Sequence, residues 1–341
     1  MVQCACCYST CTVHEADPNY TVREAAQHFV LAEEYWDRHS QLVDHIQSLW
    51  NRSDCRILRC RSCGLRFAWP FVSGDARFYN LAYPHPDYPT ERWEFEETVQ
   101  TLVSQSPLEG PVLEIGSGFG YFLRKISPRL LAPEQVVAVE YNDVARKHLC
   151  EQGFNASGVD IRNAVHDGLR GKLAAVFMFQ VIEHMDDLTG LVRRLGELVR
   201  PGADIFIAVP NPQRIAFNES HSSLRDMPPN HISGWSEAAF RALAVRAGWT
   251  LLDWRVQPMR WTAFIRQDLI YTHMQRAQRR GSLANRVRSL PRNRARRALE
   301  AGLALLAAPA RVPAWWQAAR ARAELGDSAW VHLRAGRQAP P

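Results

Sequence analysis

Three glycines alternate with other residues in the stretch Val112-Leu113-Glu114-Ile115-Gly116-Ser117-Gly118-Phe119-Gly120. Residues 112–115 have the apolar run of a short buried strand, and a helical pattern follows the glycines. Glycines between a strand and a helix permit a tight turn and bring backbone N–H groups close to a ligand. The stretch therefore predicts a cofactor-binding loop.

The kind of cofactor is indicated by the glycine spacing and by one carboxylate. Dinucleotide-binding enzymes usually need G-x-G-x-x-G, whereas Tyr121 stands where the last glycine would be. Glu140 ends the next predicted strand, Val136–Glu140. A carboxylate there accepts hydrogen bonds from ribose hydroxyls. A nucleoside cofactor is expected, and an NAD-dependent oxidoreductase is the less favoured alternative.

Cysteines predict a second site near the N-terminus, since seven of the eight precede residue 64. Two Cys-x-x-Cys pairs supply the four thiolates that a tetrahedral Zn²⁺ prefers. The gap between the pairs exceeds that of a compact four-cysteine site, but a helical insert can loop out of a zinc ribbon. Reduced cysteines without a metal are the alternative, and Cys6, Cys11 and Cys55 are substitute ligands. The predicted ligands are Cys4, Cys7, Cys60 and Cys63.

Strand and helix patterns alternate from Pro111 onward, which predicts a mostly parallel α/β sheet. Further strands are expected at 174–179, 205–209, 249–256 and 328–333. A helix beginning at Leu188 should run through Val199 until Pro201-Gly202 stops it. Five segments result: a Cys-rich module (1–75), an aromatic-rich linker and helix (76–109), a Rossmann-like domain (110–257), an Arg-rich helical insert (258–326), and a last strand and tail (327–341).

The formal net charge of +6 is unevenly distributed. Residues 260–341 contain 16 arginines, no lysine and four acids, a net +12 that leaves −6 for the remainder. Only three lysines occur in the chain, so we interpret the arginines as a solvated basic surface. Contact with phosphates, anionic lipid or nucleic acid is the alternative. With no long apolar run and no secretory signal, we expect a cytoplasmic protein.

The insert 258–326 combines arginines with the apolar run Leu299–Ala308 and the pair Trp315-Trp316. Three interpretations fit: a helical cover over the substrate site, a dimer contact, or a peripheral helix at a membrane surface. We favour the cover, because the apolar run is short for membrane binding. The oligomeric state is left open.

Residues 111–257 resemble the class I S-adenosylmethionine-dependent methyltransferases, whose first motif is similar to residues 112–120. The resemblance implies S-adenosylmethionine as the cofactor. It also implies a Rossmann-like, mostly parallel seven-stranded sheet with helices on both faces. That sheet would end in an antiparallel hairpin joining Trp249–Val256 to Ser328–Leu333.

The same resemblance assigns the cofactor-binding residues. Gly116, Gly118 and Gly120 would flank the methionine part, with Glu114 supporting the loop. Glu140 would hold the ribose and Asp160 would face the adenine amino group. Gln180 would lie beside the sulfonium.

Two looser resemblances concern metal binding, one at the cysteines and one near Gln180. The Cys-x-x-Cys pairs are similar to those of methyltransferases with a zinc-binding front module, notably sugar C-methyltransferases. Glu183-His184 resembles ubiquinone-pathway O-methyltransferases, which carry an additional Glu at the position of Gln180. A divalent ion at that position is therefore not expected.

Histidine suits proton removal from a methyl acceptor near neutral pH. Two histidines lie in segments expected to border the cleft, and we expect His231 to be the base while His184, with Glu183, shapes the pocket. Purely structural roles are the alternative for both histidines. The sequence thus predicts methyl transfer to a small molecule, with sugars and lipid-linked molecules among the candidates. A zinc-containing RNA methyltransferase is less favoured because the front module is not notably basic, and a noncatalytic scaffold is less favoured still.

Overall fold

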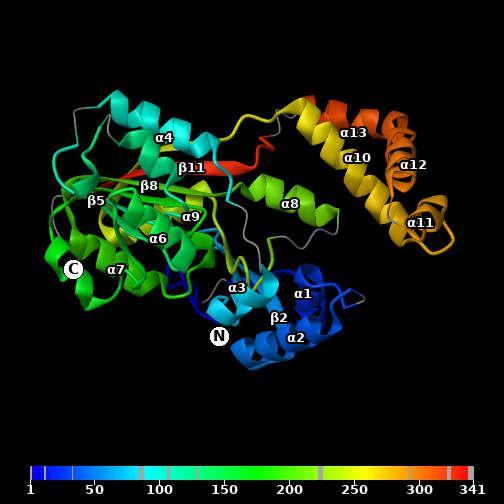
Figure 1. Ribbon diagram of the computed structural model, residues 1–341, viewed down its shortest axis with the longest axis horizontal. Helices are drawn as coiled ribbons and strands as arrows, with labels where there is room; N and C mark the ends of the chain where they lie inside the picture. The colour runs from blue at the N-terminus through cyan, green and yellow to red at the C-terminus, as the bar shows by residue number, and fades with distance from the viewer. Residues whose placement is uncertain are drawn as a thin grey trace. The chain divides into compact units, whose positions relative to one another are not determined.

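The computed structural model describes residues 2–10, 13–32, 34–83, 88–105, 108–127, 130–221, 226–291, 293–320 and 324–336. The chain divides into two compact units (Figure 1). Unit 1 comprises Met1–Pro210, Arg225–Arg255 and Ser328–Pro341, and unit 2 comprises Asn211–Leu224 and Val256–Asp327.

Unit 1 contains a seven-stranded sheet in the order β10-β11-β8-β7-β4-β5-β6. All the pairings from β8 to β6 are parallel, and β11 runs antiparallel to β8. The predicted mostly parallel seven-stranded sheet is thus confirmed, as is the adjacency of its last two strands. The strands are β4 (Val112–Ile115), β5 (Val136–Val139), β6 (Asn155–Ser157), β7 (Leu173–Phe179), β8 (Val199–Pro210), β10 (Trp249–Val256) and β11 (Ser328–Ala335).

Helices cover the sheet on both sides; in Figure 1, α4 lies on one side and α7 and α9 on the other. Their starts follow from local capping, because the side chains of Asn142, Asp187 and Ser236 accept hydrogen bonds from the first turns of α6, α7 and α9. The helices are α4 (Trp93–Val103), α5 (Tyr121–Ile126), α6 (Asp143–Glu151), α7 (Leu188–Leu198) and α9 (Glu237–Ala247), with 3₁₀ turns η1 (Pro133–Gln135), η2 (Ala164–Leu169) and η3 (Ile182–His184).

One predicted boundary is wrong. Helix α7 ends at Leu198, and Val199 begins β8, so Pro201-Gly202 lie inside a strand rather than ending the helix. Val199 pairs with Leu173, and the register then shifts before Asp204 pairs with Ala175. Proline and glycine are tolerated in a strand at such an irregularity, where a ladder hydrogen bond is already missing.

A row of aromatic rings forms part of the core between the sheet and the helices α4 and α5. Ring centroids lie 4.8 Å apart for Phe122 and Phe177, 5.6 Å for Phe177 and Phe206, and 5.9 Å for Phe206 and Trp330. These four side chains are fully or almost fully buried. Burial of these large rings stabilises the sheet around β4, the strand that leads into the glycine loop.

The cysteine-rich segment builds a second sheet in unit 1, ordered β1-β2-β3-β9. Its last strand, β9 (Ser233–Gly234), comes from far along the chain and pairs antiparallel with β3. The other elements are β1 (Val13–Thr21), β2 (Asp54–Cys60), β3 (Arg66–Trp69), and the helices α1 (Val22–Phe29), α2 (Trp36–Trp50) and α3 (Ala76–Ala82). The segment Val22–Trp50, between the two Cys-x-x-Cys pairs, contains the two helices α1 and α2.

Unit 2 is helical, consisting of α8 (Pro212–Ser220), α10 (Trp261–Gln278), α11 (Leu283–Arg288), α12 (Arg294–Leu305) and α13 (Ala308–Arg320). Its polar centre is the fully buried Asp268, which accepts hydrogen bonds from Arg311 and from the Trp315 indole. Among the described residues, no helix is long and apolar enough to cross a membrane.

Candidate functional site

The glycine loop leaves the end of β4 in a conformation that favours glycine. Gly116 and Gly118 have φ values of +74° and +52°, in the left-handed region. A Cβ on Gly116 would lie 2.5 Å from Cγ2 of Val181, so a larger residue could not be accommodated without a shift. Above Gly118 the nearest side chain is Tyr88, 3.5 Å from the position of a Cβ.

Glu140 follows β5, and its carboxylate binds the backbone of the glycine loop. Its Oε2 accepts a hydrogen bond of 2.7 Å from the N–H of Gly118, and its Oε1 accepts one of 2.8 Å from the N–H of Asn142. The sequence places this carboxylate at a strand end, and the structure brings it into direct contact with the loop. Glycine loop and acidic residue therefore form one site, as expected for a nucleoside cofactor.

Glu114 lies beneath the loop in β4 and is almost fully buried. Its Oε2 has no hydrogen-bond partner among the described residues. Burial and the nearby Glu140 raise the pKa of Glu114 well above its ordinary value. A buried polar atom without a partner is costly, so a donor group supplied by a ligand fits this position.

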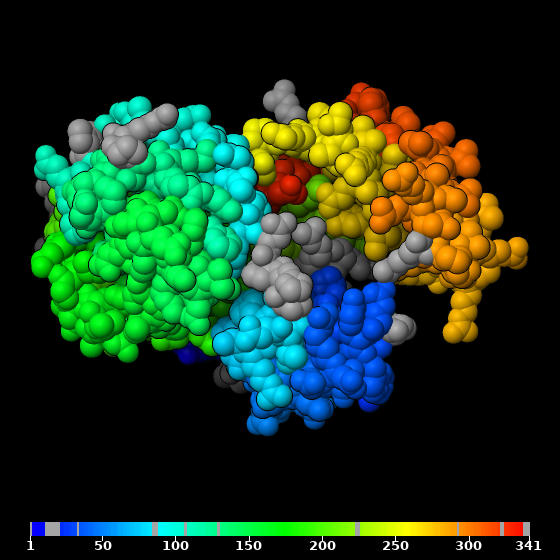
Figure 2. Space-filling model, in the orientation of Figure 1, coloured from blue at the N-terminus to red at the C-terminus, as the bar shows by residue number. Residues whose placement is uncertain are grey.

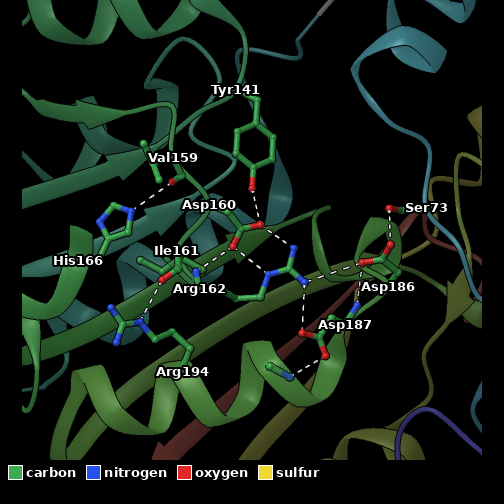
Figure 3. A network of polar contacts seen from close by, with 11 residues as sticks. Ser73, Tyr141, Val159, Asp160, Ile161, Arg162, His166, Asp186, Asp187 and Arg194 are labelled. Carbon is green, nitrogen blue, oxygen red and sulfur yellow. Dashed lines mark hydrogen bonds and ion pairs between the residues drawn. The ribbon is translucent and has the colours of Figure 1, made fainter. Parts of the chain in front are cut away.

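Asp160 follows β6 and is held by a polar network (Figure 3). Its carboxylate accepts hydrogen bonds from the Arg162 guanidinium at 2.6 and 2.8 Å and from the Tyr141 hydroxyl at 2.9 Å. Burial alone would raise the pKa of Asp160, but these partners lower it to about 2. Arg162 also lies 3.8 Å from Asp186, whose other oxygen accepts a hydrogen bond from Ser73. The cofactor side of the domain is thus tied to the segment after β7.

Gln180 lies directly after β7 with a φ of +58°. Its side-chain amide donates hydrogen bonds to Glu94 at 3.3 Å and to Ser328 at 3.1 Å. These contacts fix Gln180 at the carboxyl end of the parallel strands, where ligands bind in open α/β sheets. Its contact with the sulfonium stays a prediction.

His184 and His231 come together, with ring centroids 4.6 Å apart. Nδ1 of His184 lies 2.6 Å from the carbonyl oxygen of Asn230 and 3.1 Å from the Tyr79 hydroxyl. Because a carbonyl can only accept, Nδ1 carries the proton. Burial, together with His231, lowers the pKa of His184 to about 3, so this ring is neutral and suits a positioning role.

His231 lies in the loop before β9, next to two carboxyl groups. Its Nδ1 is 3.2 Å from Oδ1 of Asp226, an ion-pair contact without hydrogen-bond alignment. Ring nitrogens of both histidines and a carboxylate oxygen of Glu183 all lie within 4.8 Å of one another. With Nδ1 directed at Asp226, Nε2 is the nitrogen left to accept a proton from a substrate.

Glu183 is fully buried, and within the described chain neither of its carboxylate oxygens has a hydrogen-bond partner. Burial raises the pKa of Glu183 to about 7, although His231 and Arg92 oppose the rise. The pH dependence of stability should reveal this carboxyl group. Between pH 4.3, where glutamate titrates in an unfolded chain, and about 7, only the folded state keeps the proton. The free energy of unfolding should therefore fall with rising pH in that window.

The buried His184, with its lowered pKa, acts in the opposite direction up to about pH 6.5, so the test is a comparison of variants. Urea unfolding of the wild type and of Glu183→Gln is measured between pH 4.5 and 7.5. The stability difference, wild type minus variant, should fall by up to about 1.4 kcal/mol per pH unit. Parallel stability curves for the two proteins would contradict a proton held by Glu183.

The four predicted cysteine ligands meet in space. Their sulfur atoms all lie within 4.8 Å of one another, and Cys4 to Cys63 and Cys7 to Cys60 are 3.6 Å apart. Zinc–sulfur bonds of about 2.3 Å in a tetrahedron require sulfur separations of about 3.8 Å, so the set fits the metal. Burial raises the pKa of the Cys60 thiol. Hydrogen bonds, first those from the N–H groups of Cys63 and Ser62, lower it by more, so that the pKa is about 7.

Two other cysteines near the N-terminus, Cys6 and Cys55, lie outside this four-sulfur cluster. Cys6 donates to the carbonyl of Ala239, and Cys55 is buried in β2. Cys11, another substitute considered from the sequence, lies outside the described residues.

Sequence reasoning missed three contributors to the site. Tyr79 reaches His184 from α3, Tyr88 packs over the glycine loop, and Asp226 faces His231. The aromatic-rich linker was a signal for both tyrosines, since such a composition suits packing over a cleft. No pattern in the sequence singles out Asp226.

Comparison with known proteins gives a match to a described family over part of the chain. Residues 91–253 match the model of a family described as "Methyltransferase domain". A similar protein is the ubiquinone biosynthesis O-methyltransferase of Methylocella silvestris, with 36% identity over 112 residues. That alignment covers 31% of this chain and 42% of the relative, so the chain spans less than half of the relative's length.

Solved structures give weaker similarities. A putative sarcosine dimethylglycine methyltransferase from Galdieria sulphuraria has 14% identity and a TM-score of 0.42, covering 76% of this chain and 98% of that one. An S-adenosylmethionine-dependent methyltransferase from Archaeoglobus fulgidus has 15% identity and a TM-score of 0.42, covering 70% and 92% respectively.

Proposed function

We propose, on the premise that residues 91–253 are an S-adenosylmethionine-dependent methyltransferase domain, that the chain transfers a methyl group from this cofactor to a small-molecule acceptor. The observation that carries the proposal is the contact of 2.7 Å between the Glu140 carboxylate and the N–H of Gly118. It joins a ribose-binding acid to a glycine loop at the end of a parallel strand, which is the arrangement a nucleoside cofactor requires.

The bound cofactor supplies an electrophilic methyl group on a sulfonium, and the chain supplies binding and alignment. Glu140 accepts hydrogen bonds from the ribose, and Glu114 offers its unpartnered oxygen beneath the glycine loop. Gly116, Gly118 and Gly120 leave room for close backbone approach. Asp160 faces the adenine, and Gln180 lies toward the reacting centre.

His231 acts as the base in this proposal. Its Nε2 removes the proton from the acceptor hydroxyl or carbon, and Asp226 stabilises the imidazolium through its contact of 3.2 Å with Nδ1. His184 stays neutral and, with Tyr79, holds the neighbouring ring in place.

The acceptor is a small molecule, with an oxygen as the favoured methyl-accepting atom. The name of the Methylocella relative speaks of O-methyl transfer in ubiquinone biosynthesis, which supports this choice for the shared 112 residues. Sugars and lipid-linked molecules stay within the proposed class, because the two histidines and Tyr79 would serve any weakly acidic hydroxyl group.

A structural zinc ion completes the proposal. Cys4, Cys7, Cys60 and Cys63 would hold it, and their sulfur separations of 3.6 Å support tetrahedral thiolate coordination. The Cys60–Cys63 turn joins β2 to β3, so the metal would brace the sheet that receives β9. Its role is to support the fold rather than the reaction.

Calorimetric titration with S-adenosylmethionine and S-adenosylhomocysteine tests the cofactor site. Glu140→Ala should weaken binding of both by about 10- to 100-fold, since a hydrogen bond to a charged group contributes about 1.5–3 kcal/mol. Glu151→Ala, at an exposed position of α6, is the matched control and should bind as the wild type does. Failure of folded wild-type protein to bind either ligand would overturn the proposed function.

A further inference from the structure

The helix α12 in unit 2 buries Ala304 in the apolar cluster of the unit but leaves three leucines exposed. On one side of α12, Arg296 and Glu300 form an ion pair of 2.9 Å, and both side chains are mostly buried. Leu299, Leu305 and Leu306 face outward with exposed fractions of 49%, 65% and 77%. Surface helices normally bury the apolar stripe and expose the charges.

The next helix, α13, also exposes large apolar residues. Arg311 and Trp315, one turn apart, point inward and donate hydrogen bonds of 2.8 Å to the buried Asp268. Val312 and Trp316, the next residues along, are 52% and 56% exposed. Several large apolar residues of both helices are thus exposed where α12 and α13 form part of the surface of unit 2 (Figure 2, orange to red).

Positive charge surrounds this outer face. Arg294 and Arg297 are exposed on α12, and within the described chain neither forms an ion pair. Arg320 is exposed at the end of α13, with its guanidinium 3.8 Å above the Trp316 ring. Exposed leucines and a tryptophan bordered by arginines match an interface with apolar chains below and phosphates above.

We propose that the outer face of α12 and α13, made of Leu299, Leu305, Leu306, Val312 and Trp316 and bordered by Arg294, Arg297 and Arg320, binds the surface of a membrane containing anionic phospholipid. The leucines and Trp316 enter the headgroup region, and the arginines pair with lipid phosphates. A second copy of the same face would bring like charges together, which disfavours a symmetric dimer. Nucleic acid would pair with the arginines but would leave the leucines in water.

Vesicle flotation of the full chain tests the proposal, using phosphatidylcholine vesicles with and without phosphatidylglycerol. The wild type should float with the anionic vesicles and stay behind with the neutral ones. The double variant L305E/L306E should reduce partitioning by about tenfold or more, because it replaces two apolar side chains that leave water on binding with two charged ones. R294E/R297E should reduce it as well, most strongly at low salt. V245E, at an exposed position of α9 in unit 1, is the matched control and should float as the wild type does.

Circular dichroism and S-adenosylhomocysteine titration confirm that each variant is folded, so membrane binding and the proposed methyl transfer are tested separately. Three results would overturn the proposal. One is wild-type protein that ignores anionic vesicles. Another is unchanged flotation of L305E/L306E. The third is a wild-type dimer that L305E/L306E converts to monomer without any vesicle binding, which would assign the face to a second copy of the chain.

Discussion

His231→Gln is expected to lower kcat by a factor of about 10² to 10⁴, the usual contribution of a general base, while the affinity for S-adenosylmethionine stays unchanged. Glutamine preserves most of the size and polarity of the side chain but cannot take up a proton. His231 contacts Asp226 and His184 and takes no part in the Gly118–Glu140 hydrogen bond, so the effect should fall on the rate and not on cofactor binding.

The measurement is transfer of a labelled methyl group into an acceptor identified by screening phenols, sugars and lipid-linked hydroxyl compounds, with single-turnover rates for each variant. His273→Gln, on α10 in unit 2, is the control and should retain the wild-type rate. Asp226→Asn should lie between the two, because it removes the carboxylate that contacts Nδ1 of His231. An undiminished rate for His231→Gln would show that the acceptor is methylated without this base.

Cys60→Ser is expected to reduce zinc from about one ion per chain to nearly none, because four thiolates are needed to close a structural site. Structural zinc contributes on the order of 10 kcal/mol to the folding of small zinc domains, so the variant should also unfold at a much lower temperature. Metal analysis of protein from zinc-replete medium and thermal unfolding followed by circular dichroism are the measurements.

Two other cysteines serve as controls for this substitution. Cys150→Ser replaces an exposed thiol of α6, and Cys55→Ser replaces a buried thiol of β2 outside the four-sulfur cluster. Both should keep the metal, although the loss of a buried thiol lowers stability in the second. Wild-type protein with well below one zinc per chain would refute the metal site itself.

Six of the seven strands could be predicted from local sequence pattern, such as the apolar run Leu173–Phe179, whereas the short polar strand β6 (Asn155–Ser157) carries no such pattern. The end of α7 could not be predicted, since a helical pattern continues through Val199 while the pairing of Val199 with Leu173 depends on a distant strand. Residues in regular elements follow local rules. Their boundaries depend on tertiary contacts.

The candidate site likewise contains residues that the sequence could assign and residues that it could not. Glu140 and the glycines could be assigned because the motif fixes their spacing, and the structure brings them into contact. Tyr79 and Asp226 could not be assigned, because their nearness to the histidines arises from α3 and from the loop before β9, far apart in the chain. The complete burial of Glu183 was equally hidden, since burial is a property of the assembled fold.

The pairing of β9 with β3 links the cysteine-rich segment to the loop of His231. The N–H of Ala68 donates to the carbonyl of Ile232 at 2.8 Å, and the N–H of Ile232 donates to the carbonyl of Glu183 at 2.9 Å. Ile232, the residue after His231, is thus hydrogen-bonded both to β3 of the cysteine-rich sheet and to the turn η3 after β7. Exchange of the N-terminal segment by recombination would therefore also change the surroundings of His231. In the proposed function, acceptor preference should accordingly be inherited together with the segment that contains β3, and cofactor use with the glycine loop.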